Sequence, residues 1–318
     1  MTDQCQVSDD LRATVLEQLY NNPQGSKRIL SIQSHVVYGY VGNKSGVFPL
    51  QLHGYEVDPL NTVQLSNHKG YKYAPGEKLT DESFLELIDG LKSNKLLSYS
   101  HILTGYCGTT SVLQRIVGLV QEMKQNNPNL VYICDPVLGD NGEYYTPKEM
   151  MQVYRDQLVK LADVITPNVF ELSQLTGVDI KTEDDCFSAI EKVHSWGVKS
   201  IVVTSGLDNQ NKKFCYCSLK KSCGKSLRYR FHIPIVPGDY VGTGDLFASL
   251  LLIWMDKLNG NLKSAVTKVI SSIQGVLRRT NELCIGDLER GFADVELRIV
   301  QCRPELLVPT IPIFSEEL

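Results

Sequence analysis

From Arg28 onward, short runs of apolar and often β-branched residues alternate with stretches of helical periodicity. This alternation predicts a doubly wound α/β fold, a mostly parallel sheet with helices on both faces. Many of the runs are apolar throughout, which is typical of strands covered on both sides. The expected strands are 29–33, 56–65, 101–104, 130–134, 163–165, 200–204, 214–218 and 229–236. The expected helices are 45–53, 81–91, 111–125, 147–161, 168–175, 183–196, 244–258 and 262–279.

Two stretches depart from the alternation. Residues 213–236 resemble an antiparallel hairpin whose polar tip is 220–225, because two strand-like runs follow each other without a helix. Residues 1–27 combine an apolar helical stripe with a turn-rich linker, NNPQGSK. We therefore expect 1–27 to form an N-terminal extension and 28–318 to form a single domain.

Composition excludes several classes of protein. A hydrophobic fraction of 42% with a net charge of −4 excludes disorder and leaves no basic excess for nucleic acid. The longest apolar stretch, 246–255, is about half as long as a membrane-spanning helix and predicts a buried helix. The chain has no signal-like N-terminus and an odd number of cysteines, 9, which favours reduced thiols in the cytoplasm. Neither these cysteines nor the 6 histidines show metal-ligand spacing.

Polar residues follow most of the expected strands directly. In parallel sheets, ligands bind beyond the carboxyl ends of the strands. The polar exits are 34, 66–68, 105–106, 135, 166–168, 204–206 and 238–239. We therefore expect a binding site along this edge of the sheet.

The most informative segment is Val241-Gly-Thr-Gly-Asp, which precedes a very apolar helix. Gly242 and Gly244 flank Thr243 and allow a tight turn, so backbone N–H groups and a helix N-terminus can bind an anion. Asp245 cannot bind an anion, but it can accept the proton of a hydroxyl that attacks a nearby phosphorus. The alternative is a glycine-rich turn in which Asp245 only stabilises the helix dipole.

Two other phosphate-binding loops fit the sequence less well. A dinucleotide-binding fingerprint needs a third glycine where Phe247 stands. A Walker A loop needs glycine at Asn43, before Lys44-Ser45, and another at Tyr38.

Carboxylates gather at two further strand exits. Asp135 and Asp140 leave a buried strand on a Pro/Gly loop, and paired carboxylates opposite phosphates suit Mg²⁺. The alternative is a turn with solvated acids, which fits Asp140 better than Asp135. Thr166, Asn168 and Glu171 follow the next strand. Asn168 and Glu171 can also form a capping box, and both roles are compatible.

Together these segments resemble the pyridoxal kinase family of the ribokinase-like superfamily. The matching stretches, in family order, are SIQSHV, GYVGN, SNH, LTGY, CDPVLGD, ITPN, VVTS and VGTGDLF. GTGD marks the superfamily, whereas SIQSHV, GYVGN and CDPVLGD narrow it to the vitamin B6 branch. The resemblance implies ATP-dependent phosphorylation of the 5′-hydroxyl of pyridoxal, pyridoxine and pyridoxamine by a cytoplasmic homodimer.

The resemblance also implies roles for individual residues. Asp245 would be the catalytic base, and the anion hole would be Gly242, Thr243 and Gly244. The vitamer would meet Ser34, Tyr106 and position 69. ATP would meet Asp135, Tyr145, Asn168, Glu171, Thr204, Ser205, Val236, Gly238 and Thr243. Mg²⁺ would meet Asp140 and Glu171, and K⁺ or Na⁺ would meet Asp135, Thr166 and Thr204.

The chain departs from the family pattern in two places. Lys69 replaces a threonine that contacts pyridoxal, so either its side chain swings out or the contact to the vitamer changes. The loop 140–147 is shorter than in animal relatives. Two alternatives remain: a hydroxymethylpyrimidine kinase, which shares the GTGD chemistry, and a non-catalytic vitamer-binding protein on the same fold.

Overall fold

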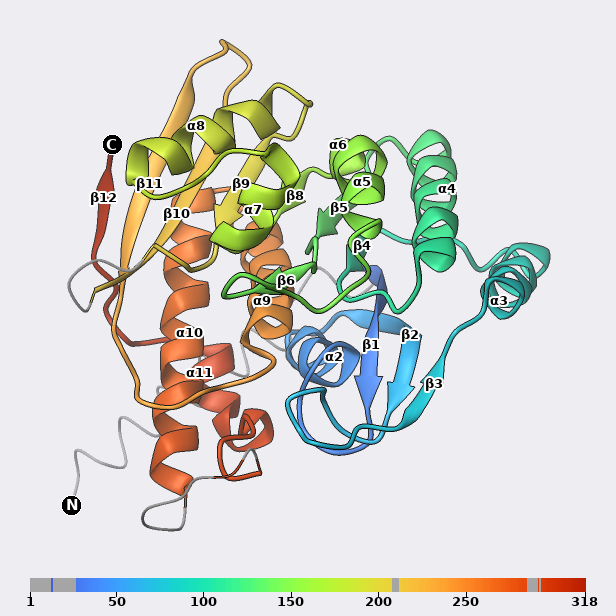
Figure 1. Ribbon diagram of the computed structural model, residues 1–318, viewed down its shortest axis with the longest axis horizontal. Helices are drawn as coiled ribbons and strands as arrows, with labels where there is room; N and C mark the ends of the chain where they lie inside the picture. The colour runs from blue at the N-terminus through green and yellow to red at the C-terminus, as the bar shows by residue number, and fades with distance from the viewer. Residues whose placement is uncertain (1–12, 14–26, 208–211, 285–290, 292) are drawn as a thin grey trace.

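A ten-stranded mixed sheet forms the centre of the protein (Figure 1). The computed structural model describes residues 13, 27–207, 212–284, 291 and 293–318. The strand order is β12-β11-β10-β9-β8-β5-β4-β1-β2-β3. The parallel strands are β2 (Glu56–Leu65), β1 (Arg28–Val36), β4 (His101–Thr104), β5 (Val131–Cys134), β8 (Val164–Ile165) and β9 (Ser200–Val203). The predicted α/β class and parallel centre are confirmed.

Antiparallel strands complete the sheet at both ends. The predicted hairpin is confirmed as β10 (Lys213–Lys220) and β11 (Ser226–Ile233), which pair from Lys213↔Ile233 to Lys220↔Ser226. This hairpin also pairs with β9, so it continues the main sheet. The short edge strands β12 (Ser315–Glu317) and β3 (Gly76–Lys78) were not predicted.

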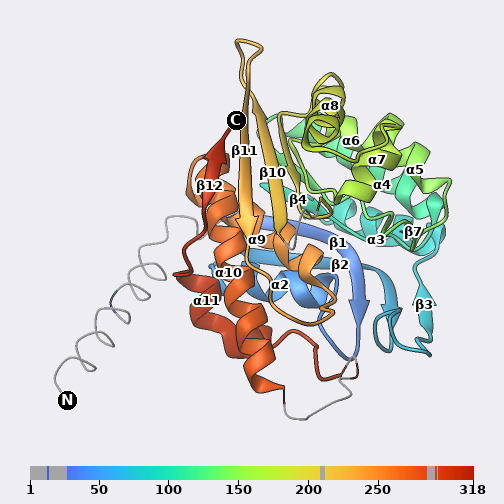
Figure 2. The same ribbon diagram turned by 60° about the vertical axis from the view of Figure 1, so that its left-hand side comes forward.

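Helices cover both faces of the sheet, as Figure 2 shows. One face carries α3 (Asp81–Ser93), α4 (Thr110–Asn126), α5 (Met150–Val153), α6 (Val159–Leu161), α7 (Val169–Thr176) and α8 (Glu183–His194). The other carries α2 (Asn43–Leu52), α9 (Thr243–Lys257), α10 (Leu262–Leu283) and α11 (Arg303–Leu307). Neighbouring side chains of β1 point to opposite faces of the sheet, so Leu30 packs in the core of the first face and Ile29 in the core of the second.

Local sequence explains most of the helix boundaries. Thr109 caps α4 by accepting a hydrogen bond from the Val112 N–H, and Thr80 caps α3 in the same way. The predicted helix 147–161 begins later, at Met150, and contains a π-helical turn at Tyr154–Leu158. Tyr154 is fully buried in this turn, and its hydroxyl donates to the Gly105 carbonyl.

The predicted buried helix is confirmed as α9, whose residues Leu246 to Trp254 are all buried. Within the described ranges, none of the helices combines the length and apolar character needed to cross a bilayer. The predicted N-terminal helix and linker lie in residues 1–27, which, apart from 13 and 27, fall outside the described residues.

Candidate active site

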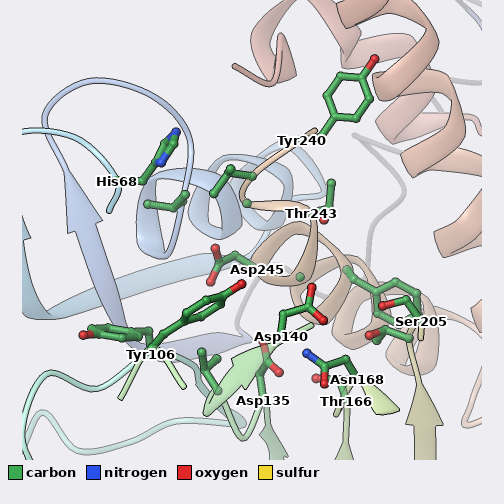
Figure 3. A pocket seen from close by; sticks show the side chains of 18 of the residues that line it. His68, Tyr106, Asp135, Asp140, Thr166, Asn168, Ser205, Tyr240, Thr243 and Asp245 are labelled. Atoms are coloured by element: carbon green, nitrogen blue, oxygen red, sulfur yellow. The ribbon is translucent and has the colours of Figure 1, made fainter. Parts of the chain in front are cut away.

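A cavity of about 560 Å³ lies at the carboxyl ends of the parallel strands (Figure 3). Asp135 follows β5, Thr166 follows β8 and Thr204 follows β9, and all three line it. The first turn of α9 forms the opposing wall. The cavity is therefore located where the topology of a parallel sheet places a ligand.

The structure brings nearly all of the expected site residues together in this cavity. They are Ser34, Lys69, Tyr106, Asp135, Asp140, Tyr145, Thr166, Asn168, Glu171, Thr204, Ser205, Gly242, Thr243, Gly244 and Asp245. Val236 and Gly238 do not line it, whereas Ile233 and Tyr240 of the same segment do. Gly238 supports this arrangement indirectly, because a Cβ there would lie 2.9 Å from the Tyr240 ring.

The glycine turn that precedes α9 is held in one conformation. Gly242 has a φ of +86°, and a Cβ at this position would lie 1.9 Å from the Tyr40 carbonyl oxygen. Only glycine fits both constraints. The Ser45 hydroxyl donates to the Gly242 carbonyl over 3.2 Å. The N–H groups of Thr243 and Gly244, which have no acceptor within the helix, are thus fixed at the cavity wall, where they suit an anion.

Asp245 stands at the N-terminus of α9, beside the other acidic residues. Burial raises the pKa of its carboxyl to about 6, although backbone N–H groups, that of Gly42 first, oppose the rise. A Cβ on Gly244 would lie 3.9 Å from the Asp135 carboxylate, so the turn directly faces the end of β5. Figure 3 shows Asp245, Asp140 and Asp135 gathered around a common space.

Asp135 and Glu171 are deeply buried carboxylic acids. Burial, then the nearby charges of Glu171 and Asp245, raises the pKa of Asp135 well above its usual value. Burial raises the pKa of Glu171 to about 8, against hydrogen bonds from backbone N–H groups. Such a concentration of buried negative charge is stable only with protons or cations present, so this part of the cavity suits a cation.

Asn168 and Glu171 form the capping box that the sequence predicts. The Asn168 side chain accepts from the Glu171 N–H over 2.8 Å, and Glu171 Oε2 accepts from the Asn168 N–H over 2.9 Å. Glu171 Oε1 accepts from the Leu138 N–H, and Asn168 Nδ2 donates to the Gly139 carbonyl. Both side chains therefore hold the start of the small hairpin β6 (Gly139–Asp140) and β7 (Glu143–Tyr144).

The donor set limits which cations fit. Among the residues that the structure describes, no three His, Cys, Asp or Glu side chains are arranged to hold a metal. Mg²⁺ does not need such a cage, because one or two carboxylates suffice when phosphates and water supply the rest. Thr166 Oγ1 is buried close to Asp135, and no described group gives it a well-formed hydrogen bond. An oxygen in this position suits a monovalent cation.

Lys69 lies at the cavity wall. Lys69 Nζ donates to the Tyr106 hydroxyl over 2.7 Å and lies 5.1 Å from the centre of that ring. It also reaches the Tyr145 carbonyl at 3.5 Å. The Lys69 side chain therefore lies along the cavity wall against Tyr106, and a changed contact to the vitamer stays a prediction.

Sequence reasoning missed the apolar walls. Val36, Val63, Leu65 and Phe247 line one part of the cavity. Ile270, Ile273 and Leu277 of α10 line another, together with the polar Gln274. The spacing of this second set marks one face of a helix, but such a pattern does not distinguish a cavity wall from the core.

Comparison with known proteins identifies relatives along nearly the whole chain. The family model described as phosphomethylpyrimidine kinase matches residues 98–290. A putative pyridoxal kinase of Caenorhabditis elegans is 49% identical over 298 residues, covering 89% of this chain and 91% of that protein. The pyridoxal kinase of Arabidopsis thaliana is 41% identical, covering 92% of this chain and 96% of that protein. The structure of Leishmania donovani pyridoxal kinase with ADP and pyridoxamine has a TM-score of 0.85 and 36% identity, covering 92% of this chain and 100% of that chain.

Proposed function

This chain belongs to the pyridoxal kinases, and on that premise we propose that it phosphorylates the 5′-hydroxyl of pyridoxal, pyridoxine and pyridoxamine with ATP. One observation carries the proposal: Asp245 lies between a fixed anion-binding turn and a buried acidic cluster, inside one cavity. A hydroxyl placed there meets a base on one side and a phosphate site on the other.

Asp245 acts as the general base. Because the pKa of its carboxyl is about 6, most of it is ionised at neutral pH and can accept the vitamer's hydroxyl proton. The 5′-oxygen forms its bond to the γ-phosphorus of ATP while the bond from that phosphorus to the leaving oxygen of ADP breaks. The proton remains on Asp245 until product release.

The turn Gly242–Gly244 stabilises the phosphoryl group during transfer. Its N–H groups and the positive end of α9 face the charge that spreads over the phosphoryl oxygens. The Tyr40 carbonyl and the Ser45 hydroxyl fix Gly242, so little reorganisation is needed as the reaction proceeds.

The two substrates occupy different parts of the cavity. Ser34, Lys69 and Tyr106 line the part assigned to the vitamer, and we propose that Ser34 binds the polar edge of the pyridine ring. Asn168, Thr204 and Ser205 line the part assigned to the nucleotide. The apolar α10 residues would cover the adenine base.

Two cations fit the acidic part of the cavity. Asp140 would hold Mg²⁺, and Glu171 would support it by fixing the backbone at Leu138 and Gly139. Bound Mg²⁺ supplies charge neutralisation for the ATP phosphates. K⁺ or Na⁺ would be held by Asp135, Thr166 and Thr204, where it would relieve the cost of the buried Asp135 charge.

We extend the proposal to the organisation of the chain. Residues 28–318 would act as one kinase domain, because β1 near its start and β12 near its end belong to the same ten-stranded sheet. A cytoplasmic location fits the cysteines of the described ranges, which are free thiols and mostly buried. Homodimerisation is proposed from the family resemblance alone.

A substrate panel at fixed Mg-ATP tests the function. Coupled ATP turnover is measured with each B6 vitamer and with hydroxymethylpyrimidine, with and without K⁺. We expect ATP consumption with the vitamers and little with the pyrimidine. Preferential turnover of the pyrimidine would favour the alternative kinase. Tight binding of pyridoxal phosphate without ATP consumption would favour a non-catalytic binding protein.

A further inference from the structure

A buried carboxylate, Glu296, contacts two loops that line the vitamer side of the cavity. Its side chain is 3% exposed and lies far from the acidic cluster in sequence. Oε2 accepts from the Tyr40 N–H over 3.1 Å, and Oε1 accepts from the Tyr71 hydroxyl over 3.2 Å. His68 Nε2 lies 3.2 Å from Oε1. One carboxylate thus joins loop 37–42 to loop 66–71.

The donors are well defined. The Gly70 N–H donates to His68 Nδ1 over 3.1 Å, so Nε2 carries the hydrogen that faces Glu296. Burial acts to raise the pKa of Glu296, but the contacts with His68, Tyr40 and Tyr71 hold it below the usual value. The carboxylate therefore stays ionised and keeps accepting from both loops.

The close approach of Glu296 depends on a glycine. Gly39 has a φ of +88°, and a Cβ there would lie 2.3 Å from Glu296 Oε1. Any larger residue at position 39 would displace the carboxylate. The glycine at position 39 thus leaves room in loop 37–42 for the Glu296 carboxylate.

Glu296 itself stands on a rigid base. The adjacent Leu297 and the nearby Ile299 are fully buried in the core beside α9 and α10. The Arg298 N–H donates to the Thr280 hydroxyl of α10 over 3.0 Å. The carboxylate is therefore fixed from the core side, and the loops are held against it.

Both loops carry residues that form the cavity. Val41 lines it from the first loop, and His68, Lys69 and Gly70 line it from the second. The first loop also reaches the catalytic turn, since the Tyr40 carbonyl packs directly on Gly242. Glu296 contacts neither the acidic cluster nor the α10 wall through any hydrogen bond that involves the described residues.

We propose that Glu296 is a positioning residue for the vitamer, which holds loops 37–42 and 66–71 as one wall of the substrate site. The proposal rests on the proposed kinase function for its kinetic consequence. Its physical basis, the junction of the two loops by one carboxylate, is independent of the substrate.

Glu296→Gln tests the role with little change of shape. The amide has one acceptor oxygen, so its NH₂ must face either the Tyr40 N–H or the donors of His68 and Tyr71. We expect kcat/KM for pyridoxal to fall about 10- to 100-fold. A loss of this size is expected when a substrate is displaced by up to about 1 Å from its reactive position. The KM for Mg-ATP should stay within about twofold, because the nucleotide walls do not contact Glu296.

Two further variants serve as comparisons. Tyr71→Phe removes one donor and leaves the carboxylate, so it should have a smaller effect in the same direction. Glu191→Gln is the matched control, because Glu191 also accepts from three side chains, those of Lys220, Ser226 and Arg228. These lie at the far end of the β10–β11 hairpin, so this variant should change stability and leave both KM values unchanged.

Hydrogen exchange of the loops separates the two proposals. In Glu296→Gln, amides of loops 37–42 and 66–71 should exchange faster than in the parent protein, whereas those of α9 should not. Equal KM changes for both substrates, or unchanged exchange in the loops, would overturn the positioning role. If the parent protein fails to phosphorylate any vitamer, the kinase function is wrong, and the exchange measurement still decides whether Glu296 holds the loops.

Discussion

The Lys69 ammonium donates a 2.7 Å hydrogen bond to the Tyr106 hydroxyl at the wall of the cavity. A positive charge therefore stands where the family resemblance implies a neutral threonine. Pyridoxamine carries a cationic aminomethyl group at neutral pH, whereas pyridoxine carries a neutral hydroxymethyl group at the same carbon. Like charges at short range repel, so Lys69 is expected to disfavour pyridoxamine.

Lys69→Met should raise kcat/KM for pyridoxamine relative to pyridoxine by about five- to tenfold, because it removes the charge and keeps an unbranched chain. Lys69→Arg is the control that retains the charge and should leave the ratio near that of the parent protein. Steady-state kinetics with both vitamers give the ratio. An unchanged ratio in Lys69→Met would show that charge at this position does not select the vitamer.

Asp245→Asn should fold normally and lose about 10²- to 10⁴-fold in kcat, the usual contribution of a positioned base. Removing a buried charge should leave the melting temperature unchanged or raised, since burial disfavours the ionised form. Asp179→Asn, at an exposed surface pair with Lys181, is the matched control. Near-parental turnover in Asp245→Asn would remove this residue from the mechanism.

The pH profile should reflect the same carboxyl. The ionised form is the active base, and burial places its pKa at about 6. As pH falls below about 6, kcat/KM for pyridoxal should therefore decline by about tenfold per pH unit. The residual activity of Asp245→Asn should lack this decline. If kcat/KM for pyridoxal does not change as the pH falls through about 6, Asp245 is not the base.

Thr166→Val should abolish the response to K⁺. The substitution keeps the side-chain shape but removes the buried Oγ1 that lies beside Asp135. In the parent protein, K⁺ should raise both turnover and the melting temperature, because a ligand that binds only the folded state stabilises it. In the variant, both responses should disappear. An undiminished K⁺-dependent shift in melting temperature would place the cation elsewhere.

The parallel part of the fold was predictable because its strands are buried on both faces and separated by amphipathic helices. The bounds of β2 and β4 agree with the expected 56–65 and 101–104. The edge strands β3 and β12 were missed, since three residues carry no periodicity. The π-helical turn at Tyr154–Leu158 was also missed, because the burial of Tyr154 between distant elements has no local signature.

The polar part of the site was predictable for a similar reason, because strand exits and the glycine turn mark it in the sequence. The apolar walls were not predictable, since they differ from core residues only in facing a cavity. Glu296 was missed because its partner Tyr40 lies 256 residues away. The donors Tyr40, His68 and Tyr71 meet Glu296 only through tertiary packing, so no spacing in the sequence relates them to it.

The edge strands also constrain how copies of this chain can meet. β3 consists of Gly-Glu-Lys and β12 of Ser-Glu-Glu, so each margin offers only a few peptide groups, flanked by charge. Short, charged edge strands resist pairing with a strand of another molecule, and this protects the sheet from edge-to-edge aggregation. These margins therefore favour helices or loops over strand pairing as the surfaces through which two copies would meet.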